Sequence, residues 1–246
     1  MVISTHHKTG TMWMLKIFLG FENFRRPKYQ FLYRQDVPLP DIDHQRISIY
    51  FEPSGSYEKS ANLAKHFRGL HVIRDPRDVI ISGAFYHMRS SEHWLHLPRD
   101  DCNGSTYQEL IKELDPESAL FFEMERYGAH TIRQMANWDY SDSRFLNVKY
   151  EDLMRDEKQV LFESIFQFLG LNNNIIQEAL AHTKSNTISP GDERPKDPHV
   201  RSGAPEQWRQ TFKRAHGRRF LELFGNVLID LGYEHDHSWI DSLPRS

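Results

Sequence analysis

Short apolar runs alternate along the chain with longer segments that have a helical repeat. Residues 2–5 have the pattern of a buried strand, 46–51 alternates apolar and polar side chains, and 70–74 is another short apolar run. Runs of this kind predict strands. An apolar helix is expected over 11–19, and a second helix is expected to start at Pro76, which suits a first turn. The unit of strand, turn and helix therefore occurs twice early in the chain.

The same alternation continues toward the C-terminus. Helices are expected over 105–114, 117–138, 174–183 and 216–231, and a strand over 144–150. Another helix is expected to be capped by Asp156 and to stop at Gly170, and the polar segment 185–205 is expected to be a surface loop. Strands separated by helices imply parallel crossovers. The pattern predicts an α/β fold with three layers, α/β/α, around a central, mainly parallel sheet, in a single domain over 1–246.

Composition narrows the class of protein. No run approaches the roughly 20 apolar residues of a membrane span, and the opening MVISTHHKTG lacks the apolar segment of a signal peptide. We therefore expect a cytoplasmic protein without stable membrane insertion. Cys102 is the single cysteine, and the 14 histidines match no recognised ligand spacing, so neither an internal disulfide nor a metal site is expected. The net charge of −3 argues against a broad nucleic-acid-binding surface.

The turn between the first strand and the first helix has the chemistry of a phosphate site. A helix N-terminus presents unpaired backbone N–H groups and a partial positive charge. Gly10 would let the backbone approach an anion, Thr9 and Thr11 would add hydroxyl donors, and Lys8 would add a charge. Trp13 offers a flat face on which a base could stack. These residues predict a P-loop-like phosphate-binding turn, with an ordinary strand-to-helix turn as the structural alternative.

The spacing differs from the Walker sequence G-x-x-x-x-G-K-[ST]. Lys8 precedes Gly10 by two residues, and no glycine opens the loop. A P-loop phosphoryl-transfer enzyme is therefore the weaker hypothesis.

The segment Lys8-Thr9-Gly10-Thr11-Met12-Trp13 resembles the K-[ST]-G-T-x-W loop of the PAPS-dependent sulfotransferases. In that family the loop holds the 5'-phosphosulfate of the donor PAPS. Met12 stands where a hydroxyl residue is frequent, which removes one side-chain contact and leaves the backbone donors. The resemblance implies a sulfotransferase that releases PAP.

Residues 74–82 follow a strand, enter a helix and resemble the family segment R-[DN]-P-[RK]-D-x-x-x-S. There the first arginine and the serine grip the donor's 3'-phosphate, which implies this role for Arg74 and Ser82. Residues 201–212 resemble the late segment R-x-G-x-x-x-x-W-[KR]-x-x-F, so Arg201, Ser202 and Gly203 are expected to complete that site. The alternatives are a capped helix with solvated Arg–Asp pairs and a surface arginine.

Two further positions match parts of the family pattern near the adenine. Tyr150 opens a segment that resembles the family's Y-E-D, whose tyrosine lies near the base, and Thr183 stands where a threonine commonly reaches it. Ser185 occupies a position where an aromatic residue is often found. Stacking on the adenine is therefore expected from Trp13 alone.

Sulfuryl transfer needs an in-line acceptor oxygen, a base for its proton and cations for the leaving oxygen. Lys8 is the expected cation. The family base is usually a histidine or glutamate after a strand between the first two motifs, which points to Glu52, while the common K-x-H signature is absent. His44, just before that strand, is the rival base.

The acceptor is expected to be a small-molecule, carbohydrate or lipid hydroxyl. Residues that could line an apolar acceptor pocket are aromatic and lie in the variable segments: Tyr29, Phe31, Tyr33, Phe85, Tyr86 and Trp94. A non-catalytic PAP-binding module is the other alternative. Many cytosolic members pair through K-x-x-x-T-V-x-x-x-E, but Lys213, Arg214 and Arg218 replace its Thr, Val and Glu, so we expect a monomer or a dimer that does not use residues 209–218.

Overall fold

The computed structural model describes residues 1–21, 29–33, 47–55, 67–187 and 203–245. These residues form two compact units. Unit 1 consists of Met1–Arg74 and Asn137–Asp192, and unit 2 consists of Asp75–Ala136 and Glu193–Ser246. Each unit is described by itself below, and the expected single domain over 1–246 remains a prediction.

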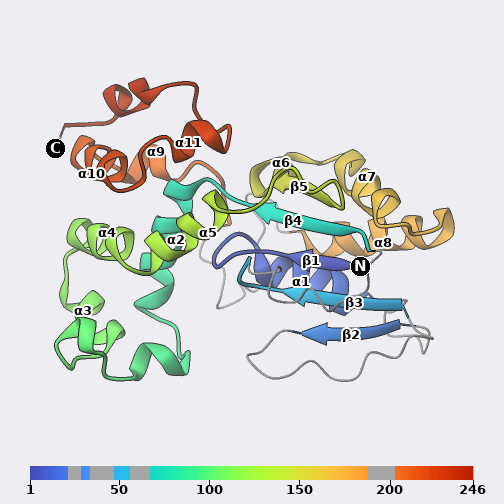
Figure 1. Ribbon diagram of the computed structural model, residues 1–246, viewed down its shortest axis with the longest axis horizontal. Helices are drawn as coiled ribbons and strands as arrows, with labels where there is room; N and C mark the ends of the chain where they lie inside the picture. The colour runs from blue at the N-terminus through green and yellow to red at the C-terminus, as the bar shows by residue number, and fades with distance from the viewer. Residues whose placement is uncertain (22–28, 34–46, 56–66, 188–202, 246) are drawn as a thin grey trace. The chain divides into compact units, whose positions relative to one another are not determined.

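Unit 1 contains a parallel sheet of five strands (Figure 1). The strands are β1 (Val2–Ser4), β2 (Tyr29–Tyr33), β3 (Ile47–Glu52), β4 (Gly69–Ile73) and β5 (Phe145–Lys149). Their order in the sheet is β2-β3-β1-β4-β5, and every neighbouring pair is parallel. In the register Ser4 pairs with Glu52 on one side and with His71 on the other. Because parallel strands end at the same edge, the segments that follow β1, β3 and β4 come close together.

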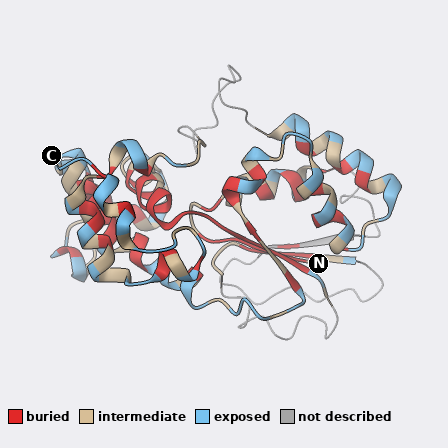
Figure 2. Ribbon diagram, turned by 90° about the horizontal axis from the view of Figure 1, so that it is seen from above, coloured by how far each residue is buried: buried red, intermediate tan, exposed pale blue. Residues whose placement is uncertain are grey.

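One face of this sheet is covered by α1 (Thr11–Gly20), α6 (Tyr150–Arg155), α7 (Val160–Phe168) and α8 (Asn173–Asn186). Their apolar side chains join those of the strands in one core cluster, to which Phe18 of α1 and Phe166 of α7 contribute. Figure 2 shows β1, β4 and most of β3 buried. The opposite face carries a smaller cluster around Tyr50 and Phe145, against which Trp138 packs. Burial on both faces explains why these strands read as apolar runs.

Unit 2 is helical in the part that the structure describes. Its longer helices are α2 (Pro76–His87), α3 (Tyr107–Glu113), α4 (Pro116–Glu125), α5 (Tyr127–Ala136) and α10 (Arg214–Phe224). Its shorter helices are η3 (His93–His96), η4 (Asp100–Cys102), α9 (Trp208–Thr211), α11 (Val227–Asp230) and η5 (His237–Ser242). Helix α2 packs against α3, α4, α5 and α9 and is therefore central to the unit.

The expected elements are present, with corrections at their ends. The helix expected over 117–138 is interrupted at Arg126 (φ −118°, ψ −103°), which separates α4 from α5. The helix expected over 216–231 is interrupted at Gly225, whose φ of 54° and ψ of −122° end α10. Asp156 follows α6, and its carboxylate accepts from Phe162 N, whereas Gln159 is the N-cap of α7. Strand β2 and helix α6 were not predicted.

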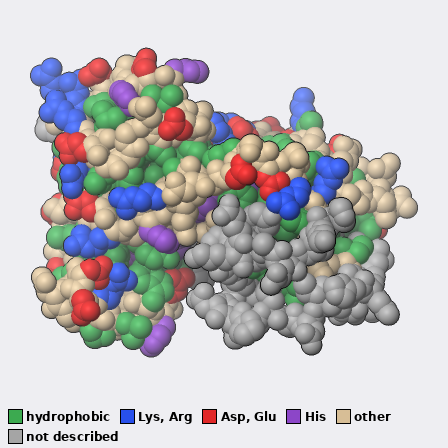
Figure 3. Space-filling model, viewed as in Figure 1, with side chains coloured by type: hydrophobic (Ala, Val, Ile, Leu, Met, Phe, Trp, Pro, Cys, Tyr) green, Lys and Arg blue, Asp and Glu red, His purple; other side chains and the backbone are tan. Residues whose placement is uncertain are grey.

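No helix in the described part of the chain combines the length and the apolar character needed to cross a membrane. On the face of unit 2 that Figure 3 shows, basic side chains are interspersed with acidic and neutral ones.

Candidate donor-binding site

The turn after β1 depends on backbone in the left-handed region. Lys8 has a φ of 63° and Gly10 a φ of 97°. A Cβ on Gly10 would lie 2.9 Å from Cδ2 of Tyr150, so glycine is needed beneath that ring. Gly10 is also the N-cap of α1 and supplies no capping side chain. A helix start of this kind suits an anion, which the backbone N–H groups of the first turn can bind.

The threonine hydroxyls of this turn stabilise the turn itself. Thr9 Oγ1 accepts from His6 N (2.9 Å) and donates to His6 O (3.0 Å). Thr11 Oγ1 donates to the same carbonyl oxygen at 2.8 Å and lies 3.0 Å from Thr5 Oγ1. To donate to a phosphate, as the sequence predicts, either hydroxyl would first have to release the His6 carbonyl.

Arg74 connects the second sequence motif to the first within unit 1. It directly follows β4 and is 5% exposed. Its Nη1 donates to Lys8 O at 3.2 Å, and its Cζ lies 4.6 Å from the centroid of the Tyr150 ring. The guanidinium is therefore fixed between the phosphate-binding turn and the first residue of α6.

Aromatic rings surround the start of α1. Trp13 meets Tyr150 edge to face, with centroids 5.7 Å apart, and meets Phe162 in the same manner at 5.7 Å. Thr183 is fully buried on α8, and its hydroxyl donates to Ala179 O at 2.8 Å. The hydroxyl oxygen keeps lone pairs that could accept from an adenine amino group, so the expected contact of Thr183 with the base remains a prediction.

Glu52 lies at the end of β3, as the sequence predicts, but it is not an exposed carboxylate. Its side chain is buried, at 0% exposure. Its Oε1 accepts from Ser54 N (3.1 Å) and from Ser54 Oγ (2.6 Å), and its carbonyl oxygen accepts from Thr5 N (2.9 Å). The last of these bonds joins Glu52 to the start of the phosphate-binding turn. His44, the rival base, lies outside the described residues.

The other expected donor-binding residues belong to unit 2. Ser82 is half-buried on α2, and Gly203, with a φ of 64°, precedes α9. Arg201 and Ser202 lie outside the described residues. Arg74 belongs to unit 1, so its expected shared contact with Ser82 on one anion remains a prediction.

The ion pairs at the start of α2 are buried rather than solvated. Arg77 Nη2 lies 2.7 Å from Asp75 Oδ2, and its Nη1 lies 2.6 Å from Glu234 Oε1. Its Cζ is 3.5 Å from the ring centroid of Trp208, which is buried. Burial alone would lower the pKa of Arg77, but Asp75 and Glu234 outweigh it and raise that pKa above its usual value. This cluster fixes the start of the helix that carries Ser82.

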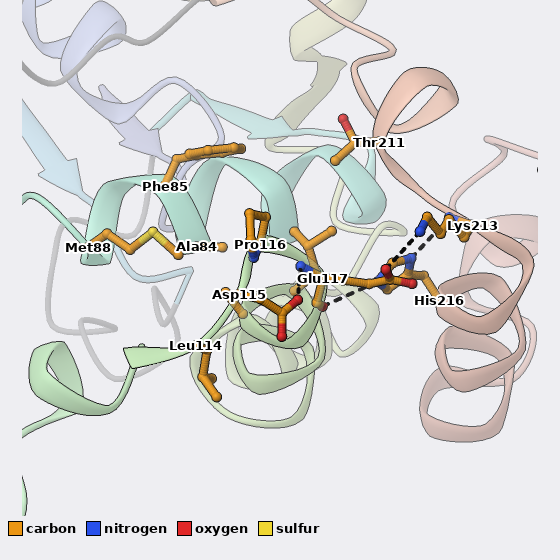
Figure 4. A pocket seen from close by; sticks show the side chains of 12 residues that line it. Ala84, Phe85, Met88, Leu114, Asp115, Pro116, Glu117, Thr211, Lys213 and His216 are labelled. Carbon is orange, nitrogen blue, oxygen red and sulfur yellow. Dashed lines mark hydrogen bonds and ion pairs between the residues drawn. The ribbon is translucent and has the colours of Figure 1, made fainter. Parts of the chain in front are cut away.

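Unit 2 contains a pocket of about 440 Å³ (Figure 4). Its walls come from α2, α4 and the segment that joins α9 to α10, and they are mostly apolar, with Phe85, Met88 and Leu120 among the lining residues. At one side Lys213 Nζ lies 2.7 Å from Glu117 Oε2. Phe85 lines this cavity, and its expected place in an acceptor pocket remains a prediction.

Two buried histidine clusters were missed by the sequence reasoning. In unit 1, His6 and His71 lie in contact at the edge of the phosphate-binding turn. In unit 2, His87 Nδ1 lies 2.8 Å from Glu123 Oε2, and Tyr107 donates to the same oxygen at 2.9 Å. Burial and the Glu123 carboxylate raise the pKa of Tyr107. The sequence did contain one sign of the first cluster, since His71 stands within an apolar strand. A polar side chain buried there needs a hydrogen-bond partner.

The whole-chain comparisons are consistent with this geometry. The chain is 22% identical over 271 residues to Sulfotransferase 2A1 of Macaca fascicularis, covering 95% of this chain and 85% of that protein. It is 28% identical over 203 residues to Carbohydrate sulfotransferase 5 of Mus musculus, covering 80% of this chain and 49% of that protein. The chain thus spans about half the length of the latter relative.

Solved structures show the same fold. Mouse sulfotransferase SULT7A1, complexed with PAP, superposes with a TM-score of 0.51 at 16% identity, covering 98% of this chain and 86% of that one. Retinol dehydratase, in complex with androsterone and inactive cofactor PAP, gives a TM-score of 0.51 at 17% identity, with coverage of 92% and 80%. The family model described as Sulfotransferase domain matches residues 1–232. With this match over nearly its whole length, the chain belongs to the sulfotransferase domain family and is a sulfotransferase.

Proposed function

We propose that this enzyme moves the sulfuryl group of PAPS to an acceptor hydroxyl by in-line transfer and releases PAP. The main support is the contact between Arg74 and the Lys8 carbonyl, which brings the first two donor motifs together in unit 1. A phosphoryl-transfer enzyme is disfavoured by the family membership and by the absent Walker spacing. The similar solved structures that contain PAP support the same donor.

In the proposed mechanism the acceptor oxygen forms a bond to sulfur while the bond from sulfur to the leaving phosphate oxygen breaks. Lys8 and the N-terminus of α1 stabilise the charge that develops on the leaving oxygen. Glu52 takes the proton of the acceptor hydroxyl. Two hydrogen bonds from Ser54 hold the Glu52 carboxylate in place. Lys8, Arg74 and Arg201 are expected to neutralise the donor phosphates without a metal ion.

We also propose that the acceptor is an apolar alcohol whose body occupies the Phe85 pocket. Phe85 follows Ser82 by three residues on α2, so the two lie on neighbouring positions of one helix surface. A volume of about 440 Å³ is within the range of small-molecule sites. Lys213 and Glu117 already neutralise each other in its wall, which favours an uncharged ligand. Androsterone, which is bound in the retinol dehydratase complex, is a molecule of this type. The similarity to Carbohydrate sulfotransferase 5 makes sugars the alternative class of acceptor. The expected cytoplasmic location remains a prediction.

The donor is tested by thermal shift with PAP and ATP, followed by transfer from radiolabelled PAPS to pooled acceptors. PAP should raise the melting temperature more than ATP, because only PAP carries a 3'-phosphate for Arg74, Ser82 and Arg201. Equal shifts would reject the donor assignment. PAP binding without transfer to any acceptor class would favour the non-catalytic module.

The acceptor class is tested with Phe85→Ala and a series of alcohols of increasing size. The variant enlarges the pocket, so its KM should rise for small apolar alcohols and fall for bulkier ones. An unchanged KM across the series would show that the acceptor binds elsewhere. Val160→Ala, at an exposed position of unit 1, is the matched control.

A further inference from the structure

A line of buried and half-buried polar side chains crosses the sheet of unit 1 beside the phosphate-binding turn. Asn147 lies on β5, His71 lies on the neighbouring strand β4, and His6 stands two residues after the end of β1, which is the next strand in the sheet. His71 Nδ1 lies 2.8 Å from Asn147 Oδ1, and His71 Nε2 lies 2.8 Å from His6 Nε2. Both histidines are completely buried. Such a line across apolar strands costs desolvation, which its hydrogen bonds must offset.

The chemistry of the groups fixes the direction of these hydrogen bonds. An amide oxygen only accepts, so His71 Nδ1 carries the proton and donates to Asn147. Neutral imidazole has a single N–H, so His71 Nε2 is an acceptor and His6 Nε2 donates to it. Burial lowers the pKa of His71 to about 3, although the hydrogen bond that His71 donates to Asn147 raises this pKa. His71 therefore stays neutral at ordinary pH, and the line has one consistent set of tautomers.

Packing holds the same two rings in place. The Trp138 ring stacks on His71 with centroids 3.7 Å apart and planes at 10°, and it meets His6 edge to face at 6.3 Å. On the side of β3, Gly55 lies directly against the His6 ring, because a Cβ there would be 2.0 Å from His6 Cε1. The ring of His6 thus has one allowed orientation between β4 and the segment after β3.

The backbone of His6 in turn organises the phosphate-binding turn. Its carbonyl oxygen accepts from the hydroxyls of both Thr9 and Thr11. Its amide donates to Thr9 Oγ1. A change in the orientation of His6 would therefore disturb the segment that starts α1.

We propose that Asn147 and His71 are positioning residues of the donor site, which act by fixing the tautomer and the orientation of His6. This inference rests on the proposed function in one respect, namely that the turn binds the 5'-phosphate end of the donor. Neither residue belongs to the three donor motifs. The role requires a neutral His71, because an imidazolium has two N–H groups and no nitrogen left to accept from His6. In the described part of the chain, ionisable groups near the line include Tyr140, whose ring lies 5.8 Å from His71, Glu52, whose carbonyl oxygen accepts from Thr5 N, and His7 and Lys8 within the turn.

The first test measures PAP affinity by calorimetry. His71→Phe keeps a ring for Trp138 and removes both hydrogen bonds, so PAP should bind about tenfold more weakly. Val148→Ala is the control, because it removes buried methyl groups from the same strand as Asn147 and leaves the line intact. It should lower the melting temperature and leave PAP affinity unchanged. Equal PAP affinity in His71→Phe and the wild type would overturn the proposal.

The second test uses Asn147→Asp to make the line sensitive to pH. A carboxylate in contact with His71 Nδ1 raises the pKa of that histidine. The variant should bind PAP like the wild type at pH 8 and clearly more weakly than the wild type at pH 5.5. A constant ratio of the two affinities across this range would contradict the role of a neutral His71.

The third test reads the tautomers directly by ¹H–¹⁵N NMR of the histidine rings. We expect a proton on His71 Nδ1 and on His6 Nε2, with His71 unchanged down to pH 5. The opposite tautomers, or titration of His71 near its ordinary pKa of about 6.5, would overturn the inference. This measurement needs no donor, so it separates the two proposals. Failure of the wild type to bind PAP would reject the proposed donor. The positions of the ring protons would still show which way the hydrogen bonds between Asn147, His71 and His6 run.

Discussion

Burial changes what can be expected of Glu52 as a base. A carboxylate at 0% exposure needs hydrogen-bond partners, and Ser54 supplies two hydrogen bonds. The side chain is thereby held in one position at the end of β3. The backbone of Glu52 is hydrogen-bonded to Thr5, at the start of the phosphate-binding turn. A fixed position is what a general base needs, provided that the acceptor hydroxyl reaches this carboxylate.

Glu52→Gln keeps the shape of the side chain and removes its basicity. Turnover should fall by about 10² to 10⁴ while PAP affinity changes little. Steady-state rates and PAP calorimetry on the same preparation check this expectation. Ser54→Ala, which keeps the carboxylate and removes one of its donors, should lose less activity. Near-normal turnover of Glu52→Gln together with loss in His44→Ala would identify His44 as the base.

Arg74→Ala should weaken PAP binding by at least tenfold. A hydrogen bond to a charged group contributes about 1.5 to 3 kcal/mol, and the buried guanidinium also supports the Lys8 carbonyl. Calorimetry with PAP and with ATP measures the effect. Arg74→Lys keeps the charge and should recover part of the affinity. An unchanged PAP affinity in Arg74→Ala would remove this residue from the donor site.

The buried His71 predicts how stability depends on pH. The folded protein keeps it neutral because burial lowers its pKa to about 3, whereas the unfolded chain binds a proton near the usual value of about 6.5. Between these values the unfolded state binds more protons, so stability falls as the pH falls from about 6.5 toward 3. One such group contributes up to about 1.4 kcal/mol per pH unit. Urea unfolding at several pH values should show a shallower acid slope for His71→Phe, and an identical slope would exclude His71 as the cause.

At the scale of elements, α2 depends on the close approach of α4. Glu123 of α4 accepts from Tyr107 and pairs with His87 through one carboxylate oxygen, which fixes its side chain. A Cβ on Gly83 would lie only 2.4 Å from the other oxygen, Oε1. The glycine therefore permits the helix that carries Ser82 to pack against this buried carboxylate.

Gly83→Ala should lower the melting temperature. Helix propensity alone predicts the opposite, a gain of about 1 kcal/mol, so the sign of the change distinguishes local preference from packing. Ser164→Ala, on the exposed side of α7, is the control in which propensity should prevail. Thermal unfolding of the two variants measures both effects. A stabilised Gly83→Ala would show that Glu123 moves aside easily.

At the scale of the whole molecule, residues 209–218 are not expected to form a subunit interface. Lys213 is paired with Glu117, and Arg214 donates to the carbonyl oxygens of Asp241 and Leu243 within unit 2. Arg218 replaces the acid of the family segment. Sedimentation should therefore show a monomer or a dimer built through other residues. A dimer crosslinked through 209–218, and lost in Lys213→Glu, would contradict this expectation.

The sequence alone determined the class of the fold and most of the donor motifs. Strands buried on both faces must be apolar, and helices between them must carry an apolar stripe. The order of elements along the chain can therefore be predicted from local patterns of apolar residues. The position of Gly10 at the start of a helix and of Arg74 after a strand follows from the same patterns. Even the burial of Trp208 and Phe212 could be expected from residue type.

Only the tertiary structure decided which polar groups meet one another. The hydrogen bond of Thr183 with its own helix, the buried environment of Glu52 and the break at Arg126 depend on neighbours that no local pattern identifies. The line from Asn147 through His71 to His6 depends on the order of the strands, β5-β4-β1. Strand order is set by the packing of the whole sheet, because the partners of each residue lie on other strands. The alternation of strands and helices, in contrast, can be predicted from the apolar pattern of each segment alone.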